Sequence, residues 1–215
     1  MQRNTYRTKL LVGLACLAAV VAIGLAVGRD MVPPRLDDVV RRQLQDWLQA
    51  RSYRGLVAKV AAERRDGHGT YVTAALPLLA AAVVAVTAGG LRRRVWAWVP
   101  WTAAMLATVP LAFGLRIAFG RPGPDEESVH AWSQGAYPSG GALLVALGWI
   151  IGGVVITWLR PSWRPAVIGL AVLALAVHLF ARVAVGDHWL TDVVGSYLLV
   201  AGVALLADPL RPRHD

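Results

Sequence analysis

Six stretches of this 215-residue chain are apolar over about 20 residues each, and this pattern restricts the fold more than any other feature. A helix needs about 20 predominantly apolar residues to cross the hydrocarbon core of a bilayer. The stretches lie at about 10–28, 70–90, 97–118, 141–159, 165–184 and 190–207. They predict an all-α polytopic membrane protein in which residues 1–215 form a single domain, a six-helix transmembrane bundle.

The composition fits a membrane protein and excludes other classes. Hydrophobic residues make up 56% of the chain and charged residues 16%, whereas charged residues account for roughly 25% of an ordinary soluble domain. The net charge of +9 could suggest a nucleic-acid partner, but a solvated basic face needs a soluble body, so none is expected. Cys16 is the single cysteine, which excludes an intrachain disulfide, a cysteine metal cluster and a redox pair.

Lysine and arginine are distributed unevenly around the apolar stretches, and positive residues near span ends tend to stay in the cytoplasm. Ten of them lie at the N-terminus, between the second and third stretches, between the fourth and fifth, and in the C-terminal tail. We therefore expect a multi-pass plasma-membrane protein with both termini cytoplasmic and with 29–69, 119–140 and 185–189 outside. The first stretch is long enough to be an anchor; a signal peptide cleaved near Ala26-Val27-Gly28 is the alternative.

The outer segment 29–69 contains a predicted amphipathic helix after the first span. Pro33-Pro34 precedes this helix and Asp37-Asp38 fall in its first turn, which suits a helix start. The helix either lies on the membrane surface or caps the outer ends of the spans, and the sequence leaves both interpretations open. Its apolar residues recur at helical spacing along one stripe, which consists of Leu36, Val40, Leu44, Trp47 and Leu48.

His188 and Asp192 are a candidate reactive pair near the outer ends of the spans. Their spacing of four residues places both side chains on one helix face, so the carboxylate can accept the Nδ1–H of the imidazole. Such a bond fixes the tautomer and directs Nε2 outward as a nucleophile or base. A purely structural His–Asp pair at the interface is the alternative.

Candidate phosphate-binding groups gather at the same membrane face. Ser139 is a candidate N-cap of the fourth span, and Gly140 and Gly141 let a phosphate approach backbone N–H groups at a helix N-terminus. Arg116 and Arg121 lie at the end of the third span and can bind phosphate oxygens bidentately. Snorkelling to lipid headgroups is the other interpretation of either arginine.

The region 116–192 resembles the type 2 phosphatidic acid phosphatase superfamily, whose three motifs read K-x6-R-P, P-S-G-H and S-R-x5-H-x3-D. Arg182, His188 and Asp192 match the third motif at the family's spacing, and Ala181 stands in place of its serine. The resemblance implies that His188 is the nucleophile that becomes phosphohistidine, that Asp192 orients it and that Arg182 binds phosphate.

The first two motifs are only partly kept. Arg116 takes the lysine position of the first motif, but Gly123-Pro124 stands where Arg-Pro is expected, and Arg121 is the candidate replacement for the missing arginine. Pro138-Ser139-Gly140 match the second motif, but Gly141 replaces the histidine that protonates the leaving group in the family.

Of two other histidines, only His130 is a candidate source of the missing proton. His130 lies on the outer loop and is the candidate substitute acid, with an exposed loop histidine as the alternative interpretation. His178 lies inside the fifth span and is expected to be a packed, hydrogen-bonded helix residue.

These features predict a phosphoric ester or diphosphate hydrolase acting on a lipid phosphate. Loss of a general acid typically costs about 10²–10⁴ in rate, whereas a phosphate leaves a diphosphate as a stable anion without a proton. We therefore expect a lipid diphosphate, such as a polyprenyl diphosphate, to be preferred over a monoester. No metal or other cofactor is expected, because the sequence offers no carboxylate cluster or multi-histidine set.

The sequence leaves two other functions open. The first alternative is a catalytically impaired relative of this superfamily that binds or transports phospholipid or polyprenyl phosphate without hydrolysing it. The second is a small transporter in which the His188–Asp192 pair relays protons.

Overall fold

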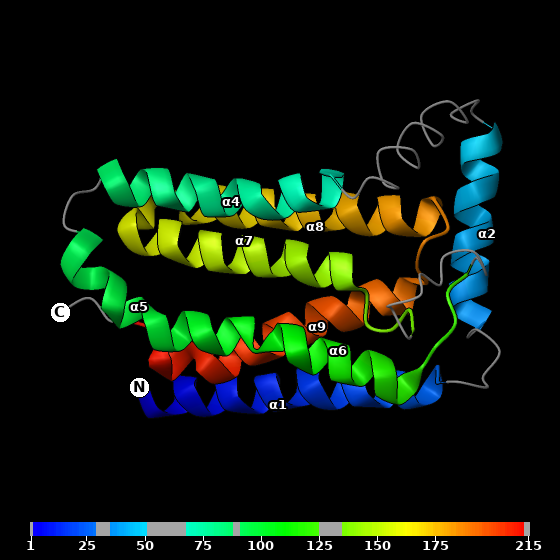
Figure 1. Ribbon diagram of the computed structural model, residues 1–215, viewed down its shortest axis with the longest axis horizontal. Helices are drawn as coiled ribbons and strands as arrows, with labels where there is room; N and C mark the ends of the chain where they lie inside the picture. Colours follow the sequence, from blue (N-terminus) through cyan, green and yellow to red (C-terminus); the bar gives the residue numbers. More distant parts are fainter. Residues whose placement is uncertain (1, 29–34, 51–67, 88–90, 125–134, 213–215) are drawn as a thin grey trace.

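The computed structural model describes residues 2–28, 35–50, 68–87, 91–124 and 135–212. These residues form helices and no strands (Figure 1). Two short 3₁₀ turns, Pro161–Trp163 and Asp208–Leu210, accompany the longer helices. The helices are α1 Gln2–Ala26, α2 Arg35–Ala50, α4 His68–Thr87, α5 Leu91–Leu106, α6 Thr108–Phe119, α7 Gly140–Leu159, α8 Arg164–Ala184 and α9 Leu190–Ala207.

Six segments of the described chain are helical, long and apolar enough to cross a membrane, as the sequence predicts. The first, second and fourth are single α-helices, and the fifth and sixth each consist of one α-helix and one of the 3₁₀ turns. The third, Trp96–Phe119, consists of most of α5 followed by α6. Pro110 explains why the third span is divided, because its nitrogen has no hydrogen to donate to the carbonyl four residues earlier. Thr108 stabilises the junction by donating its hydroxyl to the carbonyl of Met105 at 2.6 Å.

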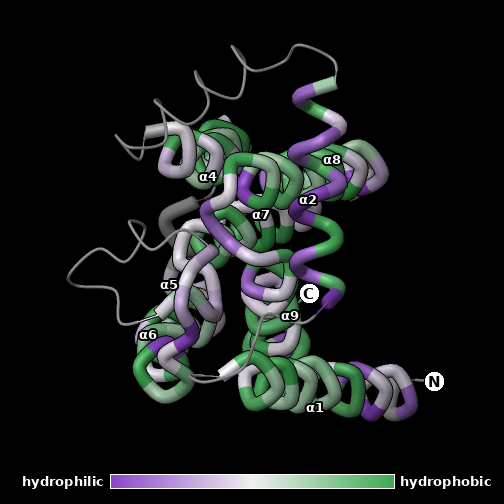
Figure 2. The backbone as a smooth tube through the Cα atoms, turned by 90° about the vertical axis from the view of Figure 1, so that its right-hand side faces the viewer, coloured by the Kyte–Doolittle hydropathy of each residue, from purple (hydrophilic) through white to green (hydrophobic). Residues whose placement is uncertain are grey.

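Helices α7 and α9 form the centre of the bundle. In their most apolar stretches 50% and 44% of residues are buried, against 11–22% in the other four spans, whose apolar surfaces suit contact with lipid. Small residues allow the close approach of neighbouring helices: a Cβ at Gly148 of α7 would lie 2.1 Å from the Ala74 carbonyl oxygen of α4. Figure 2 views the bundle from one end and colours the backbone by residue hydropathy. It shows mainly hydrophobic residues in α7 and α9 and more hydrophilic residues in α2.

Helix α2 crosses one end of the bundle, and both chain termini lie at the other end (Figure 1). Lys9 and Asp208, which pair at 2.7 Å, join the two terminal regions. Helix α2 packs on α8 and α9, so its position matches the interpretation of this helix as a cap on the ends of the spans. Leu48 is buried and Trp47 contacts the ring of Phe180 edge to face, with ring centroids 6.3 Å apart.

The buried side of α2 matches only part of the apolar stripe that the sequence indicates: Leu48 is buried, and Val40 and Leu44 are half-buried. Leu36 and Trp47 of that stripe are exposed, whereas Asp37 is completely buried. A charged residue therefore occupies the face that meets α9. The reason is that this end of α9 is polar, so a charged side chain fits against it better than an apolar one.

Candidate active site

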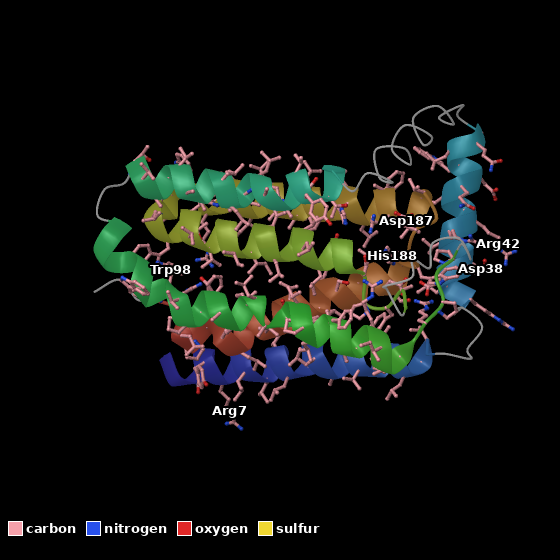
Figure 3. The ribbon with its side chains drawn as sticks, in the orientation of Figure 1. Arg7, Asp38, Arg42, Trp98, Asp187 and His188 are labelled. Atoms are coloured by element: carbon pink, nitrogen blue, oxygen red, sulfur yellow. The ribbon has the colours of Figure 1, made fainter. Side chains whose placement is uncertain are left out.

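The residues that match the third motif lie on and around the turn between α8 and α9: Arg182 in the last turn of α8, His188 in the connecting turn and Asp192 in the first turn of α9. The amide of Gly186 donates to the Val183 carbonyl at 3.1 Å, and Gly186 has φ +86°, which side chains rarely tolerate. The amide of Asp187 donates to the Arg182 carbonyl at 3.1 Å. This tight turn brings His188 back over the end of α8, and Figure 3 shows His188 and Asp187 at the end of the bundle that α2 covers.

His188 and Asp192 face each other as their spacing predicts. The Nδ1 of His188 lies 3.4 Å from Oδ2 of Asp192, and the same oxygen accepts a 3.0 Å hydrogen bond from the Trp189 amide. Asp192 is completely buried in the first turn of α9, while the His188 side chain keeps 12% of its surface exposed. The pair is thus anchored on the Asp192 side and accessible on the His188 side.

Burial sets the protonation state of His188. Desolvation lowers the pKa of its imidazole from the usual 6.5 to about 4, against the opposing effect of its hydrogen bond to Asp192. The imidazole is therefore neutral at neutral pH, and a neutral imidazole has the free lone pair that a nucleophile requires.

This pKa gives a prediction that needs no substrate. Carbethoxylation of His188 by diethyl pyrocarbonate, followed by mass spectrometry of the peptide, should proceed at a constant rate from pH 7 to about pH 5 and decline only near pH 4. N-acetylhistidine in the same solution serves as the reference and should lose reactivity near its usual pKa of about 6.5. A decline of the two rates at the same pH would contradict a buried, neutral His188.

Two arginines converge on the N-terminus of α7. A Cβ at Gly140 would lie 2.9 Å from Nη1 of Arg116, and a Cβ at Gly141 would lie 2.7 Å from Nη2 of Arg182. Because neither glycine has a side chain, the guanidinium groups of Arg116 and Arg182 can occupy the space beside them. A helix N-terminus presents backbone N–H groups without intrahelical partners, so this arrangement concentrates positive potential where an anion can bind.

Each arginine is also held by a second contact. Nε and Nη2 of Arg116 donate to the Gly135 carbonyl at 2.9 and 2.6 Å. Nη1 of Arg182 donates to Asp187 at 3.0 Å. These contacts restrict both long side chains before any ligand binds, which lowers the entropy cost of holding a phosphate.

Ser139 has the predicted N-cap position of α7. It is completely buried, and its hydroxyl accepts a 3.4 Å hydrogen bond from the Ala142 amide. Its own amide donates to the Asp192 carbonyl at 3.1 Å, and Ser196 donates its hydroxyl to the Ser139 carbonyl at 2.8 Å. The starts of α7 and α9 are thereby fixed to each other, which places the arginines next to His188.

Arg121 has a different environment from the one expected of a phosphate ligand. Its guanidinium is buried and donates from Nη1 to Asp192 at 2.5 Å and from Nη2 to Asp37 at 2.7 Å. Gly120, with φ +53°, ends α6 and turns the chain so that Arg121 reaches α9. The guanidinium N–H groups of Arg121, which the sequence suggested would bind phosphate, thus donate to the carboxylates of Asp37 and Asp192 instead.

Two further histidines and one aspartate differ in how far the sequence indicated their places. His130 lies outside the described residues. His178 is buried in α8, as expected of a packed residue, but within the described chain its Nε2 has no hydrogen-bond partner. Asp37 is the site residue that sequence reasoning missed, because its place in a helix start gave a sufficient local explanation for a carboxylate there.

The structure defines an all-α, six-span integral membrane protein with a cationic, histidine-containing site at one end of its bundle. No protein-family model matches the chain, and no curated protein matches it. Its fold is similar to that in the crystal structure of a transmembrane PAP2-type phosphatidylglycerolphosphate phosphatase from Bacillus subtilis. The TM-score is 0.66, the sequence identity is 16%, and the match covers 92% of this chain and 94% of the other. The chain therefore has the fold of a transmembrane PAP2-type phosphatase.

Proposed function

We propose that the protein is a membrane-embedded lipid phosphatase that acts through a phosphohistidine formed on His188. The observation that carries this proposal is the convergence of Arg116 and Arg182 on the N-terminus of α7, beside a buried His–Asp pair. Two guanidinium groups and a helix N-terminus suit a phosphoryl group, whose transfer depends mainly on positioning and charge stabilisation. The fold similarity to a PAP2-type phosphatase supports the same assignment.

The reaction proceeds in two steps. In the first, Nε2 of His188 attacks the terminal phosphorus, the bond from phosphorus to the leaving oxygen breaks, and the leaving group departs with the electron pair. Asp192 stabilises the positive charge that develops on the imidazole, through Nδ1. In the second step, water attacks the phosphorus, the P–N bond breaks with its electron pair returning to Nε2, and the protons of the water stay on the orthophosphate that leaves, which restores neutral His188.

The preferred substrate follows from the leaving group. Gly141 supplies no acid, and the room beside it contains the Arg182 guanidinium, which stays protonated and cannot donate a proton to an alkoxide. A diphosphate releases a lipid monophosphate anion, which needs no proton to depart. We therefore propose a lipid diphosphate, such as a polyprenyl diphosphate, as the preferred substrate.

The orientation belongs to this proposal as well. The site and the two termini lie at opposite ends of the bundle (Figures 1 and 3). Cytoplasmic termini, which the distribution of basic residues predicts, would therefore place the site at the outer face of the plasma membrane.

Phosphate release from two lipids with different leaving groups tests the proposed substrate. Purified full-length protein in detergent micelles should release phosphate from a prenyl diphosphate about 10²–10⁴ times faster than from phosphatidic acid, because only the second reaction requires the missing acid. Equal rates would contradict the preference for a diphosphate. Binding of the prenyl diphosphate without any phosphate release would contradict hydrolysis itself and support a non-hydrolysing lipid-phosphate binder.

A further inference from the structure

Asp37 lies in α2, far in sequence from the region that matches the phosphatase motifs, yet it contacts the start of α9. Its Oδ2 accepts hydrogen bonds from Arg121 at 2.7 Å and from the Thr191 hydroxyl at 2.6 Å, and its Oδ1 accepts one from the Thr191 amide at 3.0 Å. The residue is completely buried. Three polar contacts on a buried carboxylate indicate a specific site rather than a solvated helix start.

Arg121 connects Asp37 to the reactive pair. One prong of its guanidinium binds Asp37 and the other binds Oδ1 of Asp192, whose Oδ2 faces His188. Because the guanidinium is planar and rigid, fixing one prong also fixes the direction of the other. Arg121 thus holds the carboxylate that orients His188, and Asp37 of α2 in turn holds Arg121.

The charges of this cluster support the same connection. Asp37, Arg121 and Asp192 together carry a net charge of −1, since two carboxylates share one guanidinium. If Asp37 were neutral, Arg121 would compensate Asp192 alone, and less negative charge would remain to stabilise an imidazolium. Asp37 thus affects both the position and the effective charge of the carboxylate that faces His188.

We infer that Asp37 is a positioning residue for His188, acting through Arg121 and Asp192, and that α2 is part of the active-site framework. This inference rests on the proposed function, since it describes how the proposed nucleophile is held. It adds a residue from outside the three motifs and gives Arg121 a positioning role in place of phosphate binding.

Contacts of α2 that do not involve Asp37 make a selective experiment feasible. The Arg41 guanidinium lies 5.1 Å from the centre of the Trp189 ring, and Leu48 is buried. These contacts should hold α2 in place in Asp37→Asn, which keeps the shape of the side chain and removes its charge. Asp38→Asn is the matched control, because the neighbouring Asp38 pairs with the exposed Arg42 on the same helix.

The experiment measures formation of the phosphoenzyme by full-length protein with farnesyl diphosphate labelled in its terminal phosphate. Outer partners that orient metal-bound histidines typically contribute about 10–100-fold, and we expect Asp37→Asn to slow phosphoenzyme formation by a similar factor. Inhibition by orthophosphate should be unchanged, since Arg116 and Arg182 remain. Asp38→Asn should behave as the wild type. Equal weakening of orthophosphate inhibition and phosphoenzyme formation would indicate general distortion and overturn the inference.

A double-mutant cycle separates positioning from simple anchoring of α2. If Asp37 acts through Arg121, Asp37→Asn should have little further effect in an Arg121→Gln background. Independent, additive effects would overturn the proposed connection. Should Asp37→Asn fail to fold, Arg121→Lys provides the second variant: a single ammonium cannot bridge both carboxylates as a guanidinium does, so phosphoenzyme formation should slow by a similar factor. Wild-type behaviour of Arg121→Lys would contradict the inference.

Carbethoxylation of His188 distinguishes failure of this inference from failure of the proposed function. It requires no substrate and reports the nucleophilicity of the imidazole directly. Asp37→Asn should slow it several-fold even if the protein proves not to be a phosphatase. Unchanged carbethoxylation in Asp37→Asn, with a normal rate in Asp38→Asn, would overturn the positioning role whatever the substrate is.

Discussion

Replacement of His188 by alanine is expected to reduce phosphate release from a prenyl diphosphate by roughly 10⁴-fold or more, which would leave no measurable turnover. The reason is that His188 is the proposed nucleophile: its Nδ1 side faces buried Asp192, and part of its side chain remains exposed to the site. Steady-state release of orthophosphate by purified full-length protein in micelles measures this loss.

The His188→Ala variant should still bind phosphate, since both converging arginines remain in place. Thermal unfolding in detergent, with and without orthophosphate, provides the control: the shift in Tm should match that of the wild type. His188→Asn, which keeps a polar side chain of similar length, should be equally inactive. Turnover above about a tenth of the wild-type rate in either variant would be incompatible with a covalent role for His188.

Replacement of Arg182 by alanine is the second change with a large expected effect, a fall of about 10³-fold or more in kcat/KM. An arginine on the transferred phosphoryl group typically contributes about 10³–10⁵ in rate. Arg182 is placed for such a contact because its Nη2 lies beside Gly141 at the start of α7. Arg182→Lys should recover only part of the activity, because an ammonium group keeps the charge but loses the bidentate geometry.

Arg164 provides the matched control for this prediction. It belongs to the same helix as Arg182 but is exposed and lies at the other end of α8, so Arg164→Ala should leave kcat/KM unchanged. Kinetics of the three variants on a prenyl diphosphate measure the difference. Loss of less than about tenfold in Arg182→Ala would show that the guanidinium beside α7 does not bind the reacting phosphate.

The six spans could be predicted because their information is local. About 20 consecutive apolar residues form a helix and partition into a bilayer whatever their neighbours are. The division of the third span between α5 and α6 was not predicted, although Pro110 marks it in the sequence. Proline is tolerated in membrane helices often enough that its presence alone does not indicate an interruption.

The candidate site could be predicted to the extent that its residues lie close in sequence. Arg182 ends α8, His188 lies in the turn that follows and Asp192 begins α9, so their short spacing in sequence carries their relative positions. The partners of Arg121 depend instead on how α2 packs against α9. Asp37 lies 84 residues from Arg121, and no local pattern connects them.

Helix α2 shows why an amphipathic pattern was insufficient. The apolar stripe correctly indicated a helix with one buried side, which includes Leu48, but it did not indicate that pairing with Arg121 also buries Asp37. A buried carboxylate requires a paired cation, and that cation comes from the end of another helix. The burial of Asp37 therefore depends on α2 and on the segment that carries Arg121, and these two segments meet only in the folded chain.

The central claim is tested most directly by trapping the covalent intermediate. Full-length protein is mixed briefly with a prenyl diphosphate labelled in its terminal phosphate, quenched without acid because phosphohistidine is acid-labile, and digested for mass spectrometry. We predict label on the peptide that contains His188 in the wild type and no label in His188→Ala. Label retained in His188→Ala, or rapid turnover of the wild type without any labelled His188, would contradict the proposed mechanism.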